Sequence, residues 1–310
     1  RPLNGTIGVQ AISPDSGWLI LRQLPPQGEG ERLWLHRVAG TRSALVYQGE
    51  PYSADYTGPA TGSSVSRAGD VVAFSVERYV LNGGPPRPAG TYVWTRATGH
   101  ARKILDFGAT PEVSGDGRYV TLVGRRRGAS GCSSIWRFDR RSGDLRCMPG
   151  RPVAADRVTL ASGSDGRMSV YLLRDQNGRH GRLYRYTWSE RRLESLTPAG
   201  ALAALAPLPD VTAFLAAPDA SVVLFTLVSD FVSLSAARVA VHRDGVAGLA
   251  ALDLPDDGFL LAGLGGLAGD RTCLRHRGGD EGSSVSVFSL FDGRIVQHRR
   301  IPEAEEWRCS

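Results

Sequence analysis

Clustered basic side chains are the feature of this sequence that could bind a charged partner. Predicted loops in different parts of the chain carry a run of three arginines, a further arginine and a histidine, and a histidine between two arginines. Arginine holds carboxylates and phosphates through two parallel hydrogen bonds, so these groups predict a surface for an anionic small ligand or a protein partner. Solvated arginines paired with local acids are the alternative. The residues are Arg125, Arg126, Arg127, Arg174, His180 and His276.

An aromatic and acidic cluster adds to this candidate surface. Tyr52, Asp55 and Tyr56 lie close together in a segment that we expect to be a loop. We assign them, with the basic residues, to a single binding surface. Nucleic acid is not expected as the partner, because no base-stacking aromatic residues recur near the arginines.

Oxygen ligands for a metal ion are sparse. Calcium takes six to eight oxygen ligands, whereas only Gln10 and Glu112 stand on the strands expected to line a central channel. The connecting loops could add Asp55, Asp156, Asp256 and Asp257. We therefore predict no metal, no cofactor and no catalytic residue, with a metal-dependent hydrolase or lyase as the alternative. No G-x-S-x-G elbow is present to suggest a serine hydrolase.

The four cysteines favour disulfides over a zinc site, because no CxxC or His/Cys cluster is present. Three pairings are open, and we favour Cys132–Cys147 with Cys273–Cys309, because each bridge then stays within one repeat. Four buried free thiols in a cytosolic protein are the alternative. The loop that a Cys132–Cys147 bridge would close is short, and closing a loop of this length stabilises a fold by about 3 kcal/mol.

Composition is that of a folded chain, and we expect the chain to be exported. The 310 residues are 42% hydrophobic and carry a net charge of +6, almost all of it from arginine because Lys103 is the only lysine. No apolar run approaches the ~18 residues of a transmembrane helix. The sequence begins at Arg1 without a leader, so we expect a mature, extracytoplasmic form that has lost its signal peptide.

Two phrases repeat along the chain at intervals of roughly 50 residues. The first is a Ser/Ala–Pro/Gly/Asp turn between two apolar strands, and it occurs at Ser13–Gly17, Ser66–Asp70, Ser114–Gly117, Ser162–Gly166, Ala217–Asp219 and Ala268–Asp270. The second is a tight polar turn between alternating strands, centred on Ala39-Gly40, Thr98-Gly99, Ser142-Gly143, Ser189-Glu190, Asp244-Gly245 and Asp292-Gly293. The second phrase predicts β-hairpins, and the period of two throughout predicts strands, not helices.

Four strands per repeat and six repeats predict an all-β chain that forms a six-bladed β-propeller of four-stranded antiparallel blades. The approximate blades are residues 1–50, 51–107, 108–150, 151–200, 201–254 and 255–310 of one domain. The turns at Ser13–Ile20 and Ser114–Val120 resemble the SPDG turn of TolB-like six-bladed propellers, and the resemblance covers essentially the whole chain. The second and sixth repeats depart from it, with Ala68 and Gly269 in the usual Asp position. The resemblance implies the fold and says little about activity.

A propeller of this kind has one face of short turns and one of long connections. Function concentrates on variable loops held by a rigid scaffold, so we predict a binding site on the long-connection face. The expected function is that of a non-enzymatic, exported binding or scaffold protein. A structural subunit of an envelope or secreted assembly is a further alternative.

Overall fold

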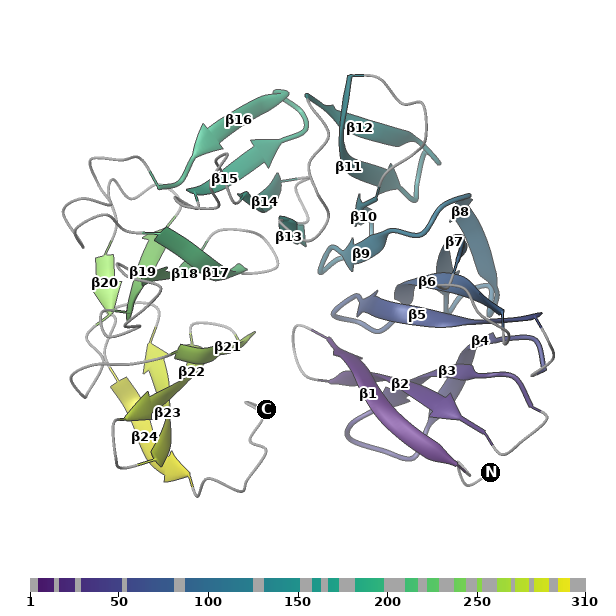
Figure 1. The fold of residues 1–310 in the computed structure, drawn as a ribbon, viewed down its shortest axis with the longest axis horizontal. Coiled ribbons are helices and arrows are strands. Elements are labelled where there is room, and N and C mark those ends of the chain that lie inside the picture. The colour runs from purple at the N-terminus through teal and green to yellow at the C-terminus, as the bar shows by residue number, and fades with distance from the viewer. Residues whose placement is uncertain are drawn as a thin grey trace. The chain divides into compact units, whose positions relative to one another are not determined.

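The computed structural model is all-β in its described part, and its strands form six four-stranded antiparallel sheets (Figure 1). We number the sheets 1 to 6 in chain order. The described residues are 5–13, 17–25, 29–51, 55–80, 87–124, 131–150, 158–162, 167–172, 182–197, 210–216, 222–228, 237–243, 250–252, 261–268, 271–278, 282–289 and 295–301. They contain no helix, and so none that could cross a membrane.

The chain divides into two compact units, Arg1–Ala155 and Asp156–Ser310. The first unit holds sheets 1 to 3: β1 (Thr6–Ile12), β2 (Trp18–Leu24), β3 (Arg32–Arg37) and β4 (Ser43–Gln48); β5 (Asp55–Val65), β6 (Val71–Val80), β7 (Arg87–Thr95) and β8 (Ala101–Leu105); β9 (Thr110–Val113), β10 (Tyr119–Val123), β11 (Cys132–Asp139) and β12 (Leu145–Pro149). In each sheet the strands follow one another in chain order. The first strands of successive sheets are neighbours, with β5 beside both β1 and β9 (Figure 1).

The second unit repeats this meander in sheets 4 to 6. Its strands are β13 (Val158–Ser162), β14 (Arg167–Leu172), β15 (Arg182–Thr187) and β16 (Arg192–Ser195); β17 (Asp210–Ala216), β18 (Val222–Val228), β19 (Ala237–Arg243) and β20 (Ala250–Leu252); β21 (Leu261–Ala268), β22 (Arg271–Gly278), β23 (Gly282–Ser289) and β24 (Ile295–Ile301). The predicted class, an all-β chain of four-stranded antiparallel sheets, is therefore confirmed. The closure of all six sheets into one ring stays a prediction.

Sheet 2 is apolar on both sides because it packs between two neighbours. Val72, Phe74 and Trp94 belong to a core shared with sheet 1, while Val71 and Ala73 belong to a core shared with sheet 3. This double burial explains the continuous apolar run at the start of β6. Each large side chain buried here contributes about 1.5–3 kcal/mol.

The serine of the first repeated phrase closes the first hairpin of sheets 1, 2 and 3 from within. Ser13, Ser66 and Ser114 are buried, and their Oγ atoms accept hydrogen bonds from the backbone N–H of Trp18, Val71 and Tyr119 at 2.9–3.1 Å. A small hydroxyl at this position satisfies an amide that the turn would otherwise leave without a partner. The recurring serine is thus a structural residue.

The turn glycines let neighbouring sheets approach closely. Gly69 and Gly117 have φ angles of +63° and +71°. A Cβ on Gly69 would lie 2.5 Å from the ring of Trp18, and one on Gly117 would lie 2.7 Å from Cγ2 of Val71. Both the backbone conformation and the space therefore require glycine, and the first strand residue after one turn packs on the turn of the next sheet.

Candidate functional site

Two tyrosines stack across the ends of β5 and β6, at the rim of sheet 2 that carries the long connections. Tyr56 and Tyr79 are register partners, and their rings lie 5.0 Å apart at an interplanar angle of 16°. Cross-strand aromatic pairs of this kind stabilise a sheet and hold each other's orientation. Both side chains are partly exposed.

A buried ion pair supports the tyrosines. Glu31, which directly precedes β3, is 3% exposed, and its Oε2 accepts hydrogen bonds from Nε and Nη2 of Arg22 at 2.9 and 2.6 Å. Gly58 leaves room for this carboxylate, because a Cβ there would lie 3.0 Å from Oε2 of Glu31 and 3.3 Å from the Tyr79 ring. The carboxylate and the ring thus pack against the same stretch of β5.

The electrostatics keep both phenols neutral. Loss of hydration raises the pKa of Tyr56, and the negative charge of Glu31 raises it further. Loss of hydration also raises the pKa of Tyr79, and the charge of Glu77, which accepts a hydrogen bond from the Tyr79 hydroxyl at 3.2 Å, adds to the effect. Burial alone would lower the pKa of Arg22, but Glu31 raises it above its ordinary value. The ion pair therefore stays charged and the tyrosines stay uncharged.

We call these five residues the tyrosine cluster: Arg22, Glu31, Tyr56, Glu77 and Tyr79. They come from both strands of the β5–β6 pair and from sheet 1, so two packed sheets fix their positions. The cluster presents flat aromatic surface and hydroxyl groups beside the paired charges of Arg22 and Glu31. Such a surface suits recognition of another molecule better than proton transfer or nucleophilic attack.

A second polar group lies on the neighbouring strands β1, β5 and β9. Ser63 Oγ donates to Oε1 of Gln10 at 3.3 Å, and the backbone N–H of Val113 donates to Oγ of Ser64 at 2.9 Å. Ser64 also makes a side-chain hydrogen bond with Glu112. Loss of hydration raises the pKa of Glu112 to about 7, although the bond to Ser64 opposes that shift. Glu112 therefore changes charge near neutral pH.

Among the predicted site residues, the structure describes the side chain of Tyr56 and places it in the tyrosine cluster. Asp55 and Tyr56 lie in β5 instead of in the expected loop, because β5 runs on beyond a register shift between Pro59 and Ser63. The side chain of Asp55, and that of His276 in β22, lie outside the described part. Tyr52, Arg125, Arg126, Arg127, Arg174 and His180 lie wholly outside it. The predicted basic surface therefore stays a prediction.

One predicted disulfide is confirmed. Cys132 in β11 and Cys147 in β12 are bridged, with their Cα atoms 5.7 Å apart. The bridge ties the two outer strands of sheet 3 together where their register shifts. Cys273 lies in β22 with its side chain outside the described part, and Cys309 lies wholly outside it. Their pairing stays a prediction.

Sequence reasoning missed the other four residues of the tyrosine cluster: Arg22, Glu31, Glu77 and Tyr79. Arg22 did give a signal, because it interrupts an otherwise largely apolar strand, and a charge in such a place indicates a buried partner. Nothing in the pattern identified Glu31 as that partner. Across the described residues, histidine, cysteine and carboxylate side chains nowhere gather in the way that metal ligands do.

Comparison with known proteins identifies the fold and no family. No family model and no curated protein sequence matches the chain. Among solved structures, TolB from Acinetobacter baumannii is similar with a TM-score of 0.50 and 16% identity, over 94% of this chain and 63% of that one. Dipeptidyl peptidase 4 from Porphyromonas gingivalis has a TM-score of 0.59 and 12% identity, over 96% of this chain and 46% of that one. A puromycin hydrolase has a TM-score of 0.57 and 13% identity, over 97% of this chain and 46% of that one.

These proteins contain β-propellers, and the similarity establishes that the present chain has the β-propeller fold. The chain spans less than two thirds of the length of each of them. Identities this low relate the folds alone, because propellers carry many unrelated functions. The activities of these proteins are therefore not transferred to the chain.

Proposed function

We propose that the chain is an exported, non-enzymatic binding propeller that recognises a protein partner through its tyrosine cluster. The observation that carries the proposal is the stacked Tyr56–Tyr79 pair at the long-connection rim. Tyrosine is among the residues that dominate the binding energy of protein interfaces, because it offers large contact area at small cost in conformational entropy.

The described charges favour a protein over an anionic small ligand at this rim. Arg22 is the arginine whose charge acts on both tyrosines, and both its Nε and its Nη2 already bond to Glu31. An incoming anion would have to displace a buried carboxylate, which is unfavourable. An anionic ligand would instead depend on the basic residues from Arg125 to Arg127 and on Arg174.

The disulfide supports an extracytoplasmic location. Cys132–Cys147 joins two strands of one sheet, as structural bridges of secreted proteins do. Such bridges are rare where thiols are kept reduced.

Site-specific photo-crosslinking tests the proposal. A benzoylphenylalanine placed at Tyr56 in the full chain, in cells of the organism that produces it, should yield a discrete adduct with one protein. The same group at His100, an exposed residue of the opposite rim, is the control and should not yield that adduct. Equal labelling from both positions, or no adduct from Tyr56, would contradict the proposal.

The identified partner then allows a measurement of binding energy. Tyr56→Ala and Tyr79→Ala should each weaken binding by about 2 kcal/mol or more, the size typical of interface hot spots. Tyr56→Phe keeps the stacked ring and should retain most of the affinity. His100→Ala, the control, should leave it unchanged.

The alternative of a metal-dependent enzyme is tested separately. Metal content of the purified chain and thermal melts with and without a chelator address it directly. We expect no stoichiometric divalent ion and an unchanged melting temperature. A bound ion whose removal lowers the melting temperature would favour the metal-dependent alternative.

A further inference from the structure

The short turns of sheets 1 to 3 carry more arginines than acids. We call the surface they form the arginine rim. Arginines and aspartates from both kinds of turn lie on it. Among the described residues they are Arg37, Arg42, Arg67, Arg96, Arg118, Arg140 and Arg141, against Asp70, Asp116, Asp139 and Asp144. This is the rim opposite the long connections that hold the tyrosine cluster.

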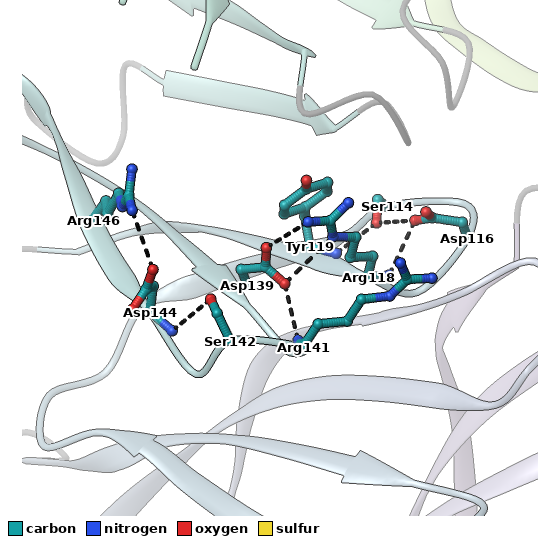
Figure 2. Close-up of polar contacts among 9 residues, drawn as sticks. All are labelled: Ser114, Asp116, Arg118, Tyr119, Asp139, Arg141, Ser142, Asp144 and Arg146. Atoms are coloured by element: carbon teal, nitrogen blue, oxygen red, sulfur yellow. Dashed lines mark hydrogen bonds and ion pairs between the residues drawn. The ribbon is translucent and has the colours of Figure 1, made fainter. Parts of the chain in front are cut away.

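The aspartates of the arginine rim are engaged by groups of their own sheet. Asp70 accepts a hydrogen bond from Ser66 Oγ at 2.5 Å, and Asp116 accepts one from Ser114 Oγ at 2.7 Å. Figure 2 shows the remaining two carboxylates, with Asp139 bonded to Arg118 and Asp144 to Arg146 at 3.0 and 3.2 Å. Each of the four carboxylates thus already has a hydrogen-bond or ion-pair partner nearby.

Asp139 illustrates how firmly these carboxylates are held. Burial alone would raise its pKa, but hydrogen bonds from the Arg118 guanidinium and from the backbone N–H groups of Arg141 and Ser142 lower it below the ordinary value (Figure 2). The carboxylate therefore stays ionised at neutral pH. It neutralises Arg118, and it uses the backbone of Arg141 without contacting its guanidinium.

Part of the positive charge is structural in the same way. Arg96 donates to the Gly69 carbonyl at 2.9 Å, and its guanidinium lies 4.2 Å from the Trp18 ring centre. Arg140 donates from Nε to the Gly117 carbonyl at 2.6 Å. These arginines fasten the two turns of one sheet to each other, so they are not available to a ligand.

Arg37 lies over the Trp18 ring, 5.8 Å from its centre, so three exposed guanidinium groups remain, one on each sheet. Among the described residues, no acid pairs with Arg42 of sheet 1, Arg67 of sheet 2 or Arg141 of sheet 3. Their backbones are nevertheless fixed. The carbonyl of Arg42 accepts a hydrogen bond at 3.2 Å, and the N–H groups of Arg67 and Arg141 donate at 3.0 and 2.9 Å. A rigid base under a free charged group reduces the entropy lost on binding.

We infer that the arginine rim is a second binding surface, which takes an extended acidic segment of a protein. Packed sheets are spaced about 10 Å apart, and sheet 2 lies between sheets 1 and 3, so a single small anion cannot bridge Arg42 and Arg141. Carboxylates distributed along an extended chain can meet them in turn. Arginine also matches a carboxylate with two parallel hydrogen bonds. This inference does not depend on the tyrosine cluster.

Fluorescence anisotropy of the full chain with a labelled glutamate–glycine peptide tests the inference. The triple variant Arg42→Ser, Arg67→Ser and Arg141→Ser should bind the peptide roughly tenfold or more weakly at low salt, from the summed loss of exposed ion pairs. It should also show a weaker dependence on salt. Thermal melts should match those of the unchanged protein, because the guanidinium groups removed support no described contact.

A second triple variant controls for net charge. Arg78→Ser, Arg102→Ser and Lys103→Ser remove the same charge from exposed positions in β6 and β8, outside the turns that form the arginine rim, and should retain the affinity. Equal weakening in both triple variants would show nonspecific attraction and overturn the inference. Phosphatidylglycerol vesicles provide the other test. Vesicle binding that depends on the three arginines, without peptide binding, would assign the rim to a membrane surface and also overturn the inference.

Discussion

Glu31 is the residue of the tyrosine cluster whose loss should cost most stability. Its carboxylate accepts both hydrogen bonds from Arg22, so Glu31→Ala leaves a largely buried guanidinium without its counter-charge. Breaking a buried pair in this way costs about 3–5 kcal/mol, and we expect the lower end because the Arg22 side chain is 23% exposed. Urea denaturation measures the change in the free energy of unfolding.

The double variant Arg22→Met with Glu31→Leu is the matched control. It removes both charges and fills the space with apolar atoms, so most of the lost stability should return. If Glu31→Ala is as stable as the unchanged protein, the Arg22–Glu31 pair is solvated and not buried.

Glu112 should make stability depend on pH. Its pKa in the folded state, about 7, lies above the ordinary 4.5, so the folded chain holds a proton that the unfolded chain has released between these values. Stability should therefore fall as pH rises from about 4.5 through 7, by up to about 3 kcal/mol from this group.

The variant Glu112→Gln isolates this contribution. The carboxamide of the glutamine does not ionise. The stability of the variant relative to the unchanged protein should therefore increase as the pH is raised from 5 to 8. Denaturant midpoints at several pH values provide the comparison. A difference between the two proteins that does not vary with pH would show that the Glu112 pKa is ordinary.

Individual site residues could be predicted from the sequence only where their neighbours in the chain gave a signal. Tyr56 was chosen as a candidate because it lies near Tyr52 and Asp55, and its part in binding stays a prediction, whereas Cys132 was correctly paired with Cys147 by repeat position. Tyr79 was missed because its significance comes from a register partner in another strand. Register across a bulged strand is set by packing, which a period of two does not reveal.

The hairpin elements depend on their buried serines, as Ser66 shows. Its Oγ accepts hydrogen bonds from the N–H groups of Asp70 and Val71 and donates to the Asp70 carboxylate. Ser66→Ala leaves these groups buried without that partner and should lower the free energy of unfolding by about 1–3 kcal/mol. Ser142→Ala, which removes an exposed turn hydroxyl, should change it by less than about 0.5 kcal/mol.

Element type was predictable because the turn chemistry repeats. Serine, aspartate and glycine mark the hairpins, and alternating apolar residues mark the strands, so the four-stranded antiparallel sheets were predicted correctly. The extent of β5 was not, because it continues through a bulge around Gly62, whose φ of +106° is available mainly to glycine. A glycine-rich segment therefore looked like a loop.

At the scale of the whole molecule, one face of sheet 1 tests the predicted closed ring. Ile7, Val9, Ile12 and Leu45 are 39–42% exposed, an unusual density of exposed apolar side chains. A closed ring requires another sheet to cover them. A fragment of residues 1–155 should therefore self-associate in sedimentation experiments, while the full chain should not. A monomeric fragment with a native-like melt would argue against the closed ring.

The backbone bonds that join the paired turns have a consequence for amide hydrogen exchange. Val38, Arg96 and Arg140 donate to carbonyls of the other turn of their own sheet, and Arg67 donates to a turn of the next sheet. Amides in exposed turns ordinarily exchange with solvent almost at once, yet these four should exchange as slowly as those inside the sheets. The short turns then open only when whole sheets open. Lengthening a connection on the opposite rim should leave their exchange unchanged.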